Sequence, residues 1–221
     1  MASVLIVGAN RGIGLELCRH LSARGDSVLA TCRRSTPELE ALSGVQVHTD
    51  VDVTSPETVA ALVFRLGPQS LDLLFIVAGI MKPVDLAHFN ADLVREQFEV
   101  NALGAVRTTV QLLPCMKDGA KIGLLTSRMG SIADNSSGGS YGYRMSKAAL
   151  NAAGRSLALD LRPRGIAVGI LHPGWVRTDM TQRQGLIDAA SSAEGLIQRM
   201  DELSMDSSGT FVHQSGELLP W

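Results

Sequence analysis

Tyr143 and Lys147 are the two residues of this chain whose types and spacing suggest proton-transfer chemistry. They lie four positions apart in a predicted helix, so both side chains project from one helix face. An ammonium group beside a phenol favours the phenolate and lowers the pKa of the phenol from about 10 towards neutrality. Such a tyrosine can donate a proton to a carbonyl or remove one from an alcohol. The alternative is a surface pair; Tyr141 is a poor candidate because Met145 occupies its i+4 position.

Two further polar residues are expected to face the same crevice. Ser127 follows a predicted strand at its carboxyl end, where its hydroxyl can hydrogen-bond the oxygen of a substrate carbonyl. Asn101 lies inside a predicted helix, and asparagine is a poor helix-interior residue, so we expect a polar role for it. The alternatives are a hydroxyl that caps a turn at Ser127 and a solvent-facing amide at Asn101.

A glycine-rich turn, G-A-N-R-G-I-G, directly follows the first predicted strand. Glycines at a strand-to-helix turn let the backbone approach a pyrophosphate, which binds at the free N–H groups of the helix N-terminus. The spacing G-x-x-x-G-x-G differs from the ordinary dinucleotide fingerprint G-x-G-x-x-G, so a turn without a ligand is the alternative. The residues predicted to bind the cofactor here are Gly8, Asn10, Arg11, Gly12, Ile13 and Gly14.

The end of the second predicted strand, with the sequence C-R-R, indicates which dinucleotide binds. A site for NAD usually carries an acidic residue about 20 positions after the glycine turn, but positions 27–37 contain no Asp or Glu. Arginine there suits the 2′-phosphate of NADP. We therefore predict NADP as the cofactor, bound through Arg33 and Arg11, with Arg34 a weaker candidate. Otherwise Arg33 and Arg34 are solvated loop charges.

Short β-branched and apolar runs alternate along the chain with longer helical patterns. Runs that are apolar on both faces and separated by helices are typical of a parallel sheet covered on both sides. The sequence therefore predicts a doubly wound, Rossmann-type α/β fold of about seven strands, with ligands beyond the carboxyl ends of the strands. The predicted strands lie within residues 4–7, 27–32, 45–53, 71–77, 122–126, 166–171 and 210–213. The predicted helices lie at 12–24, from Ser55 onwards, and at 91–116, 141–161 and 191–203.

The composition of the 221 residues argues against several classes of protein. Lys and Arg number 20 against 22 Asp and Glu, so there is no basic excess to bind a nucleic-acid backbone. The three cysteines and five histidines show no metal-ligand spacing, so we predict no metal site. No apolar run is long enough to span a bilayer, and no basic signal segment opens the chain. We expect one domain over residues 1–221, located in the cytoplasm, with neither nucleic-acid nor membrane partners.

Taken together, the motifs resemble the short-chain dehydrogenase/reductase family along essentially the whole chain. The segments around Ser127 and Tyr143, the run H-P-G-W-V-R-T-D-M at 172–180 and the ending L-L-P-W are similar to one branch of that family. This branch holds the C-factor proteins and the sniffer-type carbonyl reductases. The motifs that occur in the family's order are the glycine turn, Asp52-Val53, Asn101, Ser127, the Tyr143–Lys147 pair and Pro173-Gly174.

The resemblance implies NADP-dependent reduction of a small carbonyl compound, an aldehyde, ketone or quinone, to an alcohol. Tyr143 would be the catalytic acid/base, and Lys147 would lower its pKa while binding the nicotinamide ribose. Ser127 would position the carbonyl, and Asn101 would support a water-linked proton relay to Lys147. The alternative is a nucleotide-binding signalling protein of the C-factor type with little or no turnover, and the presence of all four residues argues against it.

The resemblance also implies the remaining contacts to the cofactor. Asp52 and Val53 would contact the adenine. The family usually has Asn-Asn-Ala-Gly after the fourth strand, whereas residues 76–79 here are I-V-A-G. The small pair Ala78-Gly79 still lets the backbone approach the adenosine ribose, but the hydrogen bonds of the two asparagines are lost. The residues expected at the nicotinamide end are Pro173, Gly174, Val176 and Thr178.

A homodimer is expected because the predicted helices 91–116 and 141–161 carry apolar residues on more than one face. A helix with a second apolar surface must bury it, and a two-fold contact is the commonest solution. Members of the resembled family often dimerise through these helices. The apolar residues that suggest this contact are Val94, Phe98, Val106, Leu150 and Leu157.

Overall fold

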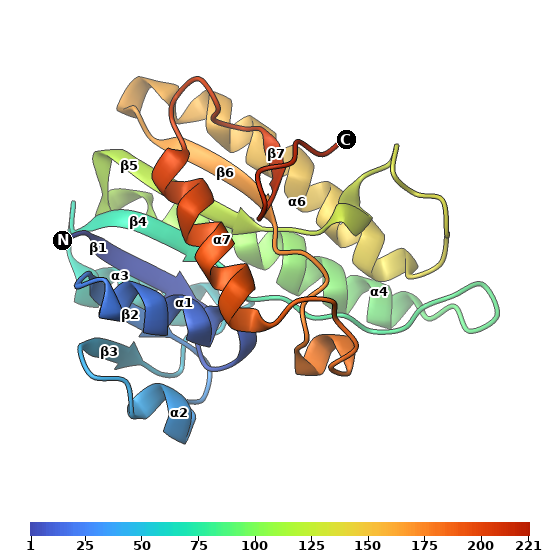
Figure 1. Ribbon diagram of the computed structural model, residues 1–221, viewed down its shortest axis with the longest axis horizontal. Coiled ribbons are helices and arrows are strands. Elements are labelled where there is room, and N and C mark those ends of the chain that lie inside the picture. The colour runs from blue at the N-terminus through green and yellow to red at the C-terminus, as the bar shows by residue number, and fades with distance from the viewer.

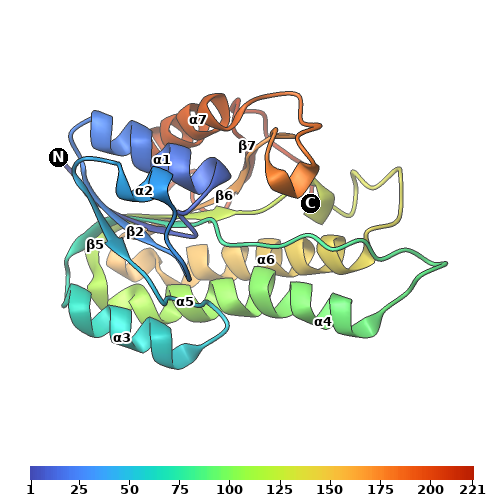
Figure 2. The ribbon, with the colours of Figure 1, turned by 90° about the horizontal axis from the view of Figure 1, so that it is seen from below.

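The computed structural model describes residues 1–221 as a seven-stranded parallel sheet between two layers of helices (Figure 1, Figure 2). The strand order is β3-β2-β1-β4-β5-β6-β7, so the chain starts mid-sheet, moves to one edge and then crosses to the other. This confirms the predicted doubly wound fold. The strands are β1 (Ser3–Val7), β2 (Ser27–Thr31), β3 (Val45–His48), β4 (Leu71–Ile76), β5 (Met116–Leu125), β6 (Ala167–His172) and β7 (Phe211–His213).

The helices cover both faces of this sheet, with α1 and α7 on one face and α3, α4, α5 and α6 on the other (Figure 2). Side-chain caps fix where two of them begin: Thr36 accepts the Leu39 N–H, and Ser55 accepts the Thr58 N–H, each followed by a proline at the first helical position. The helices are α1 (Gly12–Ala23), α2 (Pro37–Glu40), α3 (Pro56–Leu66), α4 (Ala91–Phe98), α5 (Ala105–Leu112), α6 (Tyr141–Asp160) and α7 (Ala189–Glu202).

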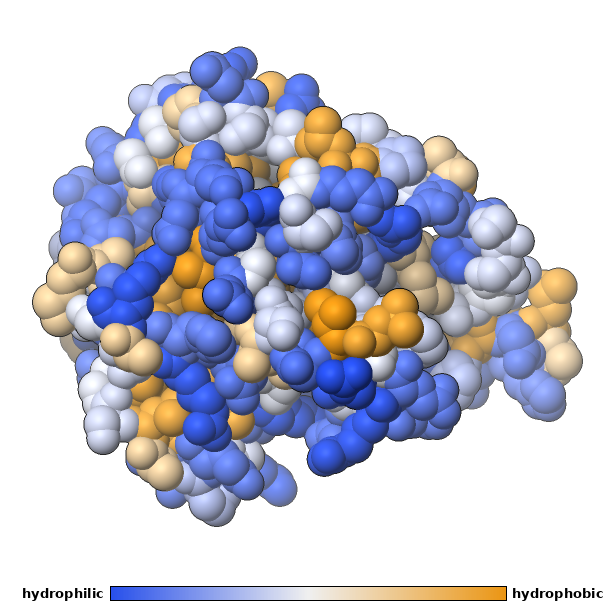
Figure 3. Space-filling model, viewed as in Figure 1, coloured by the Kyte–Doolittle hydropathy of each residue, from blue (hydrophilic) through white to orange (hydrophobic).

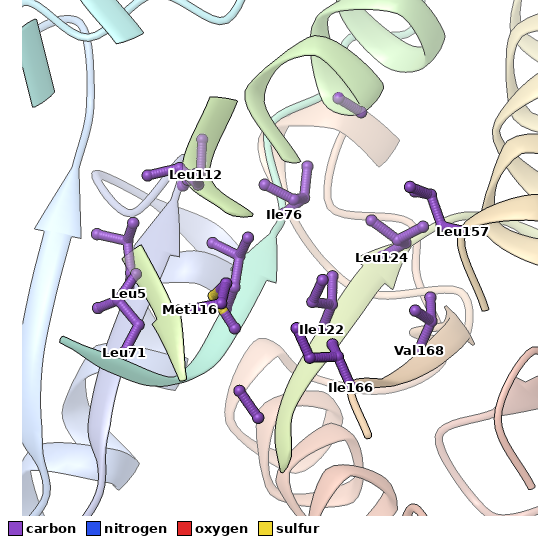
Figure 4. Packing of buried hydrophobic residues seen from close by; sticks show 14 of the residues in the cluster. Leu5, Leu71, Ile76, Leu112, Met116, Ile122, Leu124, Leu157, Ile166 and Val168 are labelled. Atoms are coloured by element: carbon purple, nitrogen blue, oxygen red, sulfur yellow. The ribbon is translucent and has the colours of Figure 1, made fainter. Parts of the chain in front are cut away.

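Alternation along each strand divides the apolar core into two clusters. Leu5 of β1 belongs to the cluster under α3, α5 and α6, which also contains Leu112 and Leu157 (Figure 4). Its neighbour Ile6 packs on the opposite face, with Leu17 of α1. Each fully buried leucine contributes about 1.5–3 kcal/mol of transfer free energy. The two clusters together hold the strands in place, and the carboxyl ends of β1, β4, β5 and β6 then meet at one edge.

The predicted helix 91–116 is wrong in two respects. The helix is interrupted after α4 by a π-helical turn, Glu99–Gly104, before α5 begins. Gly104 in this turn packs so closely on Val53 that an added Cβ would lie 3.0 Å from the Val53 Cγ2 atom. The chain also leaves the helix earlier than predicted: α5 ends at Leu112, a 3₁₀ turn spans Leu113–Cys115, and Met116 already begins β5.

Two residues chosen as evidence for a dimer face are core residues instead. Leu150 and Leu157 point into the cluster beneath the sheet, and their exposed fractions are 1% and 9%. Val94, Phe98 and Val106 are half-buried. The helical pattern of the sequence marks apolar positions but does not tell which of two apolar faces meets the sheet.

The remaining surface and thiol groups show few special features. The side of the molecule with α1 and α7 in front is mostly hydrophilic, with separate apolar patches (Figure 3). Cys18, Cys32 and Cys115 are unpaired and buried, and burial raises the pKa of the Cys18 thiol to about 12.

None of the helices has the length and apolar character needed to cross a membrane. No group of three or more His, Cys, Asp or Glu side chains is arranged to hold a metal ion.

Candidate active site

A pocket of about 410 Å³ opens beyond the carboxyl ends of β5 and β6. This is the edge where ligands bind in doubly wound sheets. Its wall combines residues that directly follow the two strands with residues of the first turns of α1 and α6. The predicted site residues that line it are Ile13, Ser127, Tyr143, Pro173, Gly174, Val176 and Thr178.

Tyr143 and Ser127 lie side by side in the wall of this pocket. Tyr143 lies in the first turn of α6 and is only 8% exposed. Burial raises the pKa of Tyr143 to about 12, although hydrogen bonding to the Ser127 side chain lowers it. The Ser127 hydroxyl also accepts the Met129 N–H at 3.1 Å, so Ser127 caps the following turn and still faces the pocket. The phenol therefore keeps its proton throughout the neutral pH range.

Lys147 lies one helical turn beyond Tyr143, as the spacing predicts. Its Nζ atom is 5.8 Å from the centre of the Tyr143 ring and donates a hydrogen bond to the Leu125 carbonyl at 2.8 Å. Burial lowers the pKa of Lys147 to about 8. The expectation of a lowered Tyr143 pKa is wrong for this structure. Desolvation of the buried phenolate raises the pKa of Tyr143 and outweighs the lowering by the hydrogen bond with Ser127.

Asn101 is fully buried in the π-helical turn, which excludes the solvent-facing alternative. Its side chain binds both backbone groups of Ile80, with Oδ1 accepting the N–H and Nδ2 donating to the carbonyl, each at 2.8 Å. Nδ2 also donates to the Ser146 hydroxyl at 3.0 Å, and Ser146 in turn donates to the Tyr143 carbonyl at 2.8 Å. Asn101 thus connects the loop after β4 to the helix that carries Tyr143.

Asn101 and Lys147 also converge on one glycine. An added Cβ at Gly79 would lie 3.2 Å from Asn101 Oδ1 and 3.6 Å from Lys147 Nζ. A side chain at position 79 would therefore fill the space in front of both groups. The small residue predicted at this position is needed to keep the amide and the amine accessible from the loop after β4.

The glycine turn fits the pyrophosphate of a dinucleotide. Gly8 has φ +93°, and an added Cβ would lie 2.7 Å from the Ala78 nitrogen, so the β1 and β4 loops approach closely. Gly12 has φ +54°, a conformation that favours glycine. Arg11 precedes α1 without a side-chain cap, and the first turn of α1 holds no acidic residue. The N–H groups of this helix N-terminus are therefore open to an anion.

The arginines expected at a 2′-phosphate are exposed and weakly paired. Arg33 Nη1 lies 3.9 Å from an Asp52 oxygen, and Arg11 Nη1 lies 3.9 Å from Asp179. Asn10 Nδ2 donates to the Arg34 carbonyl at 3.2 Å and fastens the arginine loop to the glycine turn. Both guanidinium groups keep free N–H donors, which fits the binding of a phosphate group.

The adenine end combines backbone placement with core packing. Asp52 Oδ1 accepts from the Thr54 N–H and hydroxyl, whereas the Val53 side chain is 6% exposed and packs in the core. The Val53 side chain is therefore turned away from any ligand, and the Val53 carbonyl accepts a hydrogen bond from Arg107 Nη1 at 3.3 Å. The apolar Ile76 and Val77 pack on opposite core clusters where the family usually has asparagines. The loop keeps its position because the Val77 and Ala78 N–H groups both donate to the Val7 carbonyl at 2.9 Å.

Several pocket residues had no assigned role in the sequence interpretation. They are Met81, Thr126, Arg128, Met129, Asp134, Arg144, His172, Trp175, Met180 and Thr181. A positional signal was available for some of them, because His172 ends a strand and Arg128 and Arg144 directly follow Ser127 and Tyr143. Ser146 was missed as well, because its role depends on Asn101, which is distant in the sequence.

The sequence and the fold of this chain are similar to those of known dehydrogenases and carbonyl reductases. The sequence model of the short chain dehydrogenase family matches residues 2–186. A 1-hydroxy-2-glutathionyl-2-methyl-3-butene dehydrogenase of Rhodococcus is 43% identical over 227 residues, covering 100% of both chains. The carbonyl reductase Sniffer of D. melanogaster superposes with a TM-score of 0.93 at 31% identity, again over 100% of both chains. The C-signal of Myxococcus xanthus is 47% identical over 59% of this chain and 80% of its own. Because the family model matches most of the length of this chain, the chain belongs to the short-chain dehydrogenase family.

Proposed function

We propose that this chain is an NADP-dependent carbonyl reductase that converts a small aldehyde, ketone or quinone to an alcohol. The observation that carries the proposal is the convergence of a protonated Tyr143 phenol and the Ser127 hydroxyl in one pocket, with the Lys147 amine behind them. Two neighbouring hydroxyl donors that line one pocket suit a carbonyl oxygen that gains negative charge during reduction.

The cofactor in this proposal is NADPH. Its pyrophosphate would lie at Gly8, Gly12 and the N-terminus of α1, and its 2′-phosphate at Arg33 and Arg11. A carbonyl reductase from chicken fatty liver, described as NADPH bound, superposes with a TM-score of 0.90 at 30% identity over 100% of this chain. When bound, NADPH supplies the hydride.

The residues of the chain would provide binding, orientation and a proton. The Ser127 and Tyr143 hydroxyls hold the carbonyl oxygen, and Tyr143 gives its proton to that oxygen as the alcohol forms. The Lys147 ammonium stabilises the resulting phenolate, and its remaining N–H donors are available to the nicotinamide ribose. Asn101 keeps Ser146 and the loop at Ile80 in place and would support a proton path to Lys147.

A nucleotide-binding signalling protein is the second candidate, because of the similarity to the C-signal of Myxococcus xanthus. Both candidates can be tested by following NADPH oxidation with a panel of aldehydes, ketones and quinones. Turnover that depends on Tyr143 supports the reductase. Tight NADPH binding without turnover across the whole panel would support the signalling protein instead.

We further propose that two copies assemble through the outer faces of α5 and α6. Exposed apolar side chains recur at seven-residue spacing. Leu103 of the π-helical turn and Val110 of α5 form one set, and Met145, Ala152 and Leu159 of α6 form the other. Seven residues are close to two helical turns, so each set forms a stripe. A two-fold axis would bury these stripes against their copies.

We also propose that residues 1–221 form one domain and that the protein is located in the cytoplasm. Residues 1–221 are taken as one domain because β7, beyond the match to the family model, completes the same sheet as β1. A cytoplasmic location is supported by the three unpaired, buried cysteines, which suit a reducing compartment.

A further inference from the structure

The wall of the pocket carries one cation without a carboxylate partner. Arg128, Asp134 and Arg144 are the Arg, Lys, Asp and Glu residues that line the pocket. Arg128 is compensated twice, because its Nη2 atom lies 2.6 Å from a Glu217 oxygen and its Nη1 atom lies 3.6 Å from an Asp134 oxygen. Asp134 is thereby paired as well. The charge of Arg144 therefore remains without a counter-ion in the wall of the pocket.

Arg144 lies near the start of α6, directly after Tyr143, and is half-buried. All of its hydrogen-bond acceptors are neutral groups. Its Nε donates to the Gly138 carbonyl at 3.2 Å, Nη1 to the Met129 carbonyl at 3.4 Å and Nη2 to the Ser137 hydroxyl at 2.8 Å. A guanidinium has five N–H donors, so one on each of Nη1 and Nη2 stays free. These two donors match the two oxygens of a carboxylate.

The Arg144 guanidinium lies within reach of the Ser127 hydroxyl. This hydroxyl accepts the Met129 N–H at 3.1 Å, and the carbonyl of the same Met129 accepts from Arg144 Nη1 at 3.4 Å. One residue thus separates the two groups, and its backbone bond lengths limit the distance from Ser127 Oγ to Arg144 Nη1 to at most about 11 Å. A ligand bound by both groups needs only a short spacer between its carbonyl and its carboxylate, and one aromatic ring fits this span.

We propose that Arg144 binds a carboxylate of the substrate, so that the pocket prefers aldehydes and ketones that carry a carboxylate beyond a short apolar spacer to neutral ones. This inference rests on the proposed carbonyl reductase function. An unpaired cation in a recess that is partly shielded from water attracts an anion more strongly than a cation in bulk water does. Met81, Met129 and Trp175, which also line the pocket, suit an apolar or aromatic spacer.

The alternative is that Arg144 only fastens the loop at residues 129–138 to α6. Its three hydrogen bonds all end on this loop. An arginine that only holds a loop in place would affect every substrate of the pocket alike. Recognition of a charge discriminates between ligands that differ in charge alone.

A matched pair of ligands separates the two roles. 4-Formylbenzoate and 4-formylbenzamide share the ring and the aldehyde and have nearly the same shape, but only the benzoate is charged at neutral pH. We would measure the dissociation constant of each ligand from the protein–NADP⁺ complex by calorimetry, and kcat/KM for each with NADPH. The variants are Arg144→Gln, which keeps N–H donors without the charge, and Arg144→Lys, which keeps the charge. Arg177→Gln is the control, because Arg177 lies between two lining residues, does not line the pocket itself and pairs with Asp188 at 3.7 Å.

We expect the unmodified protein to bind the benzoate about tenfold more tightly than the benzamide, the effect of one charge-assisted contact in a half-buried site. Arg144→Gln should remove most of this preference, Arg144→Lys should keep part of it, and Arg177→Gln should leave it unchanged. Equal affinities of the unmodified protein for the two ligands, equal losses for both in Arg144→Gln, or weaker NADP⁺ binding by that variant would overturn the inference.

The two readouts also separate this inference from the proposed function. If both aldehydes are reduced with NADPH but neither binding nor kcat/KM depends on the charge of the ligand, only this inference fails. If the benzoate binds selectively without any NADPH oxidation, the proposed function fails.

Discussion

The Nζ atom of Lys147 lies 5.8 Å from the centre of the Tyr143 ring, and burial shifts the pKa of the two groups in opposite directions. The phenol pKa rises to about 12 and the amine pKa falls to about 8. Near pH 7 the phenol therefore keeps its proton, and the amine keeps most of its charge. This is the protonation state that donates a proton to a carbonyl oxygen and then stabilises the phenolate that remains.

Replacing Tyr143 by phenylalanine should nearly abolish carbonyl reduction. Tyr143→Phe removes the proton donor and keeps the ring, so we expect at least about a hundredfold loss of kcat. Tyr141→Phe is the matched control, because Tyr141 starts the same helix but does not line the pocket. Steady-state NADPH oxidation compares the two variants. Equal losses in both, or a larger loss in the control, would show that Tyr143 is not the proton donor.

The protein should bind NADPH about ten- to hundredfold more tightly than NADH. A guanidinium–phosphate contact contributes roughly 1.5–3 kcal/mol, and each 1.4 kcal/mol corresponds to tenfold in affinity. Arg33→Ala should therefore weaken NADPH and leave NADH nearly unchanged, whereas the neighbouring Arg34→Ala should have a smaller effect. Calorimetric titration of both cofactors measures this. Equal affinities of the unmodified protein for NADPH and NADH would contradict the prediction.

Burial decides whether a carboxylate that shifts the preference from NADPH towards NADH belongs at position 32 or at position 33. Cys32 is 4% exposed, so an aspartate there would be largely buried, whereas the Arg33 side chain is 72% exposed. Arg33→Asp should therefore move the preference towards NADH, because the carboxylate repels the phosphate and accepts the ribose hydroxyls. No change in the ratio of the two dissociation constants would exclude position 33 as the determinant.

Lys147 should make the stability of the protein depend on pH in the alkaline range. Its pKa is about 8 in the folded protein and close to 10.5 when exposed, so between these values the unfolded chain binds more protons. The free energy of unfolding then rises with pH across this window, by roughly 3 kcal/mol in total. Lys147→Met should flatten that rise. Denaturant unfolding at pH 7.5–10 measures it, with Lys82→Met, a half-exposed lysine that pairs with Glu96, as control. Parallel curves for Lys147→Met and the unmodified protein would contradict the assignment.

Loss of Asn101 should affect both stability and turnover. Asn101→Ala leaves the Ile80 N–H and carbonyl without their buried partner, at a cost of about 1–3 kcal/mol for an unsatisfied buried group. We expect a lower Tm and a reduced kcat with little change in the affinity for NADPH. Asn151→Ala, which removes a buried asparagine of α6 outside the pocket, is the control. A purely structural role would lower Tm in both variants and leave kcat unchanged.

A charge on the exposed apolar stripe should separate the two copies of the proposed dimer. Leu103→Glu combined with Leu159→Glu places carboxylates on α6 and on the π-helical turn before α5, where both side chains are nearly half exposed. Phe64→Glu is the control, because Phe64 is 90% exposed on α3. Sedimentation at micromolar concentration distinguishes the species. A monomeric unmodified protein would exclude the dimer.

The spacing of residues along the sequence was sufficient to predict the parts of the site that lie within one helix or one turn. Tyr143 and Lys147 share a helix face because they are four residues apart, and the glycine turn is recognisable because it joins a strand to a helix. The direction of the Tyr143 pKa shift was not predictable in this way, because it depends on how deeply α6 is covered. The partners of Asn101 were not predictable either, since Ile80 and Ser146 are 21 and 45 residues away.

The same limit explains the errors in the fold. Leu150 and Leu157 are apolar residues on an amphipathic helix, and only the packing on the sheet shows that their face is the inner one. A π-helical turn has no distinctive composition, because it differs from an α-helix by one additional residue within the turn. The helical pattern therefore continues through Glu99–Gly104 without a visible break.

The π-helical turn makes the geometry of the active site depend on the number of residues in the chain. Deleting one residue between 99 and 104 would let the segment rewind as a regular α-helix, in which each residue advances by about 100°. Asn101 would then be rotated away from Ile80 and Ser146, although every site residue would still be present. An insertion or deletion in this turn would thus inactivate the protein by changing the direction in which the Asn101 side chain points around the helix axis. A sequence alignment that scores only the identity of the site residues would overlook this change.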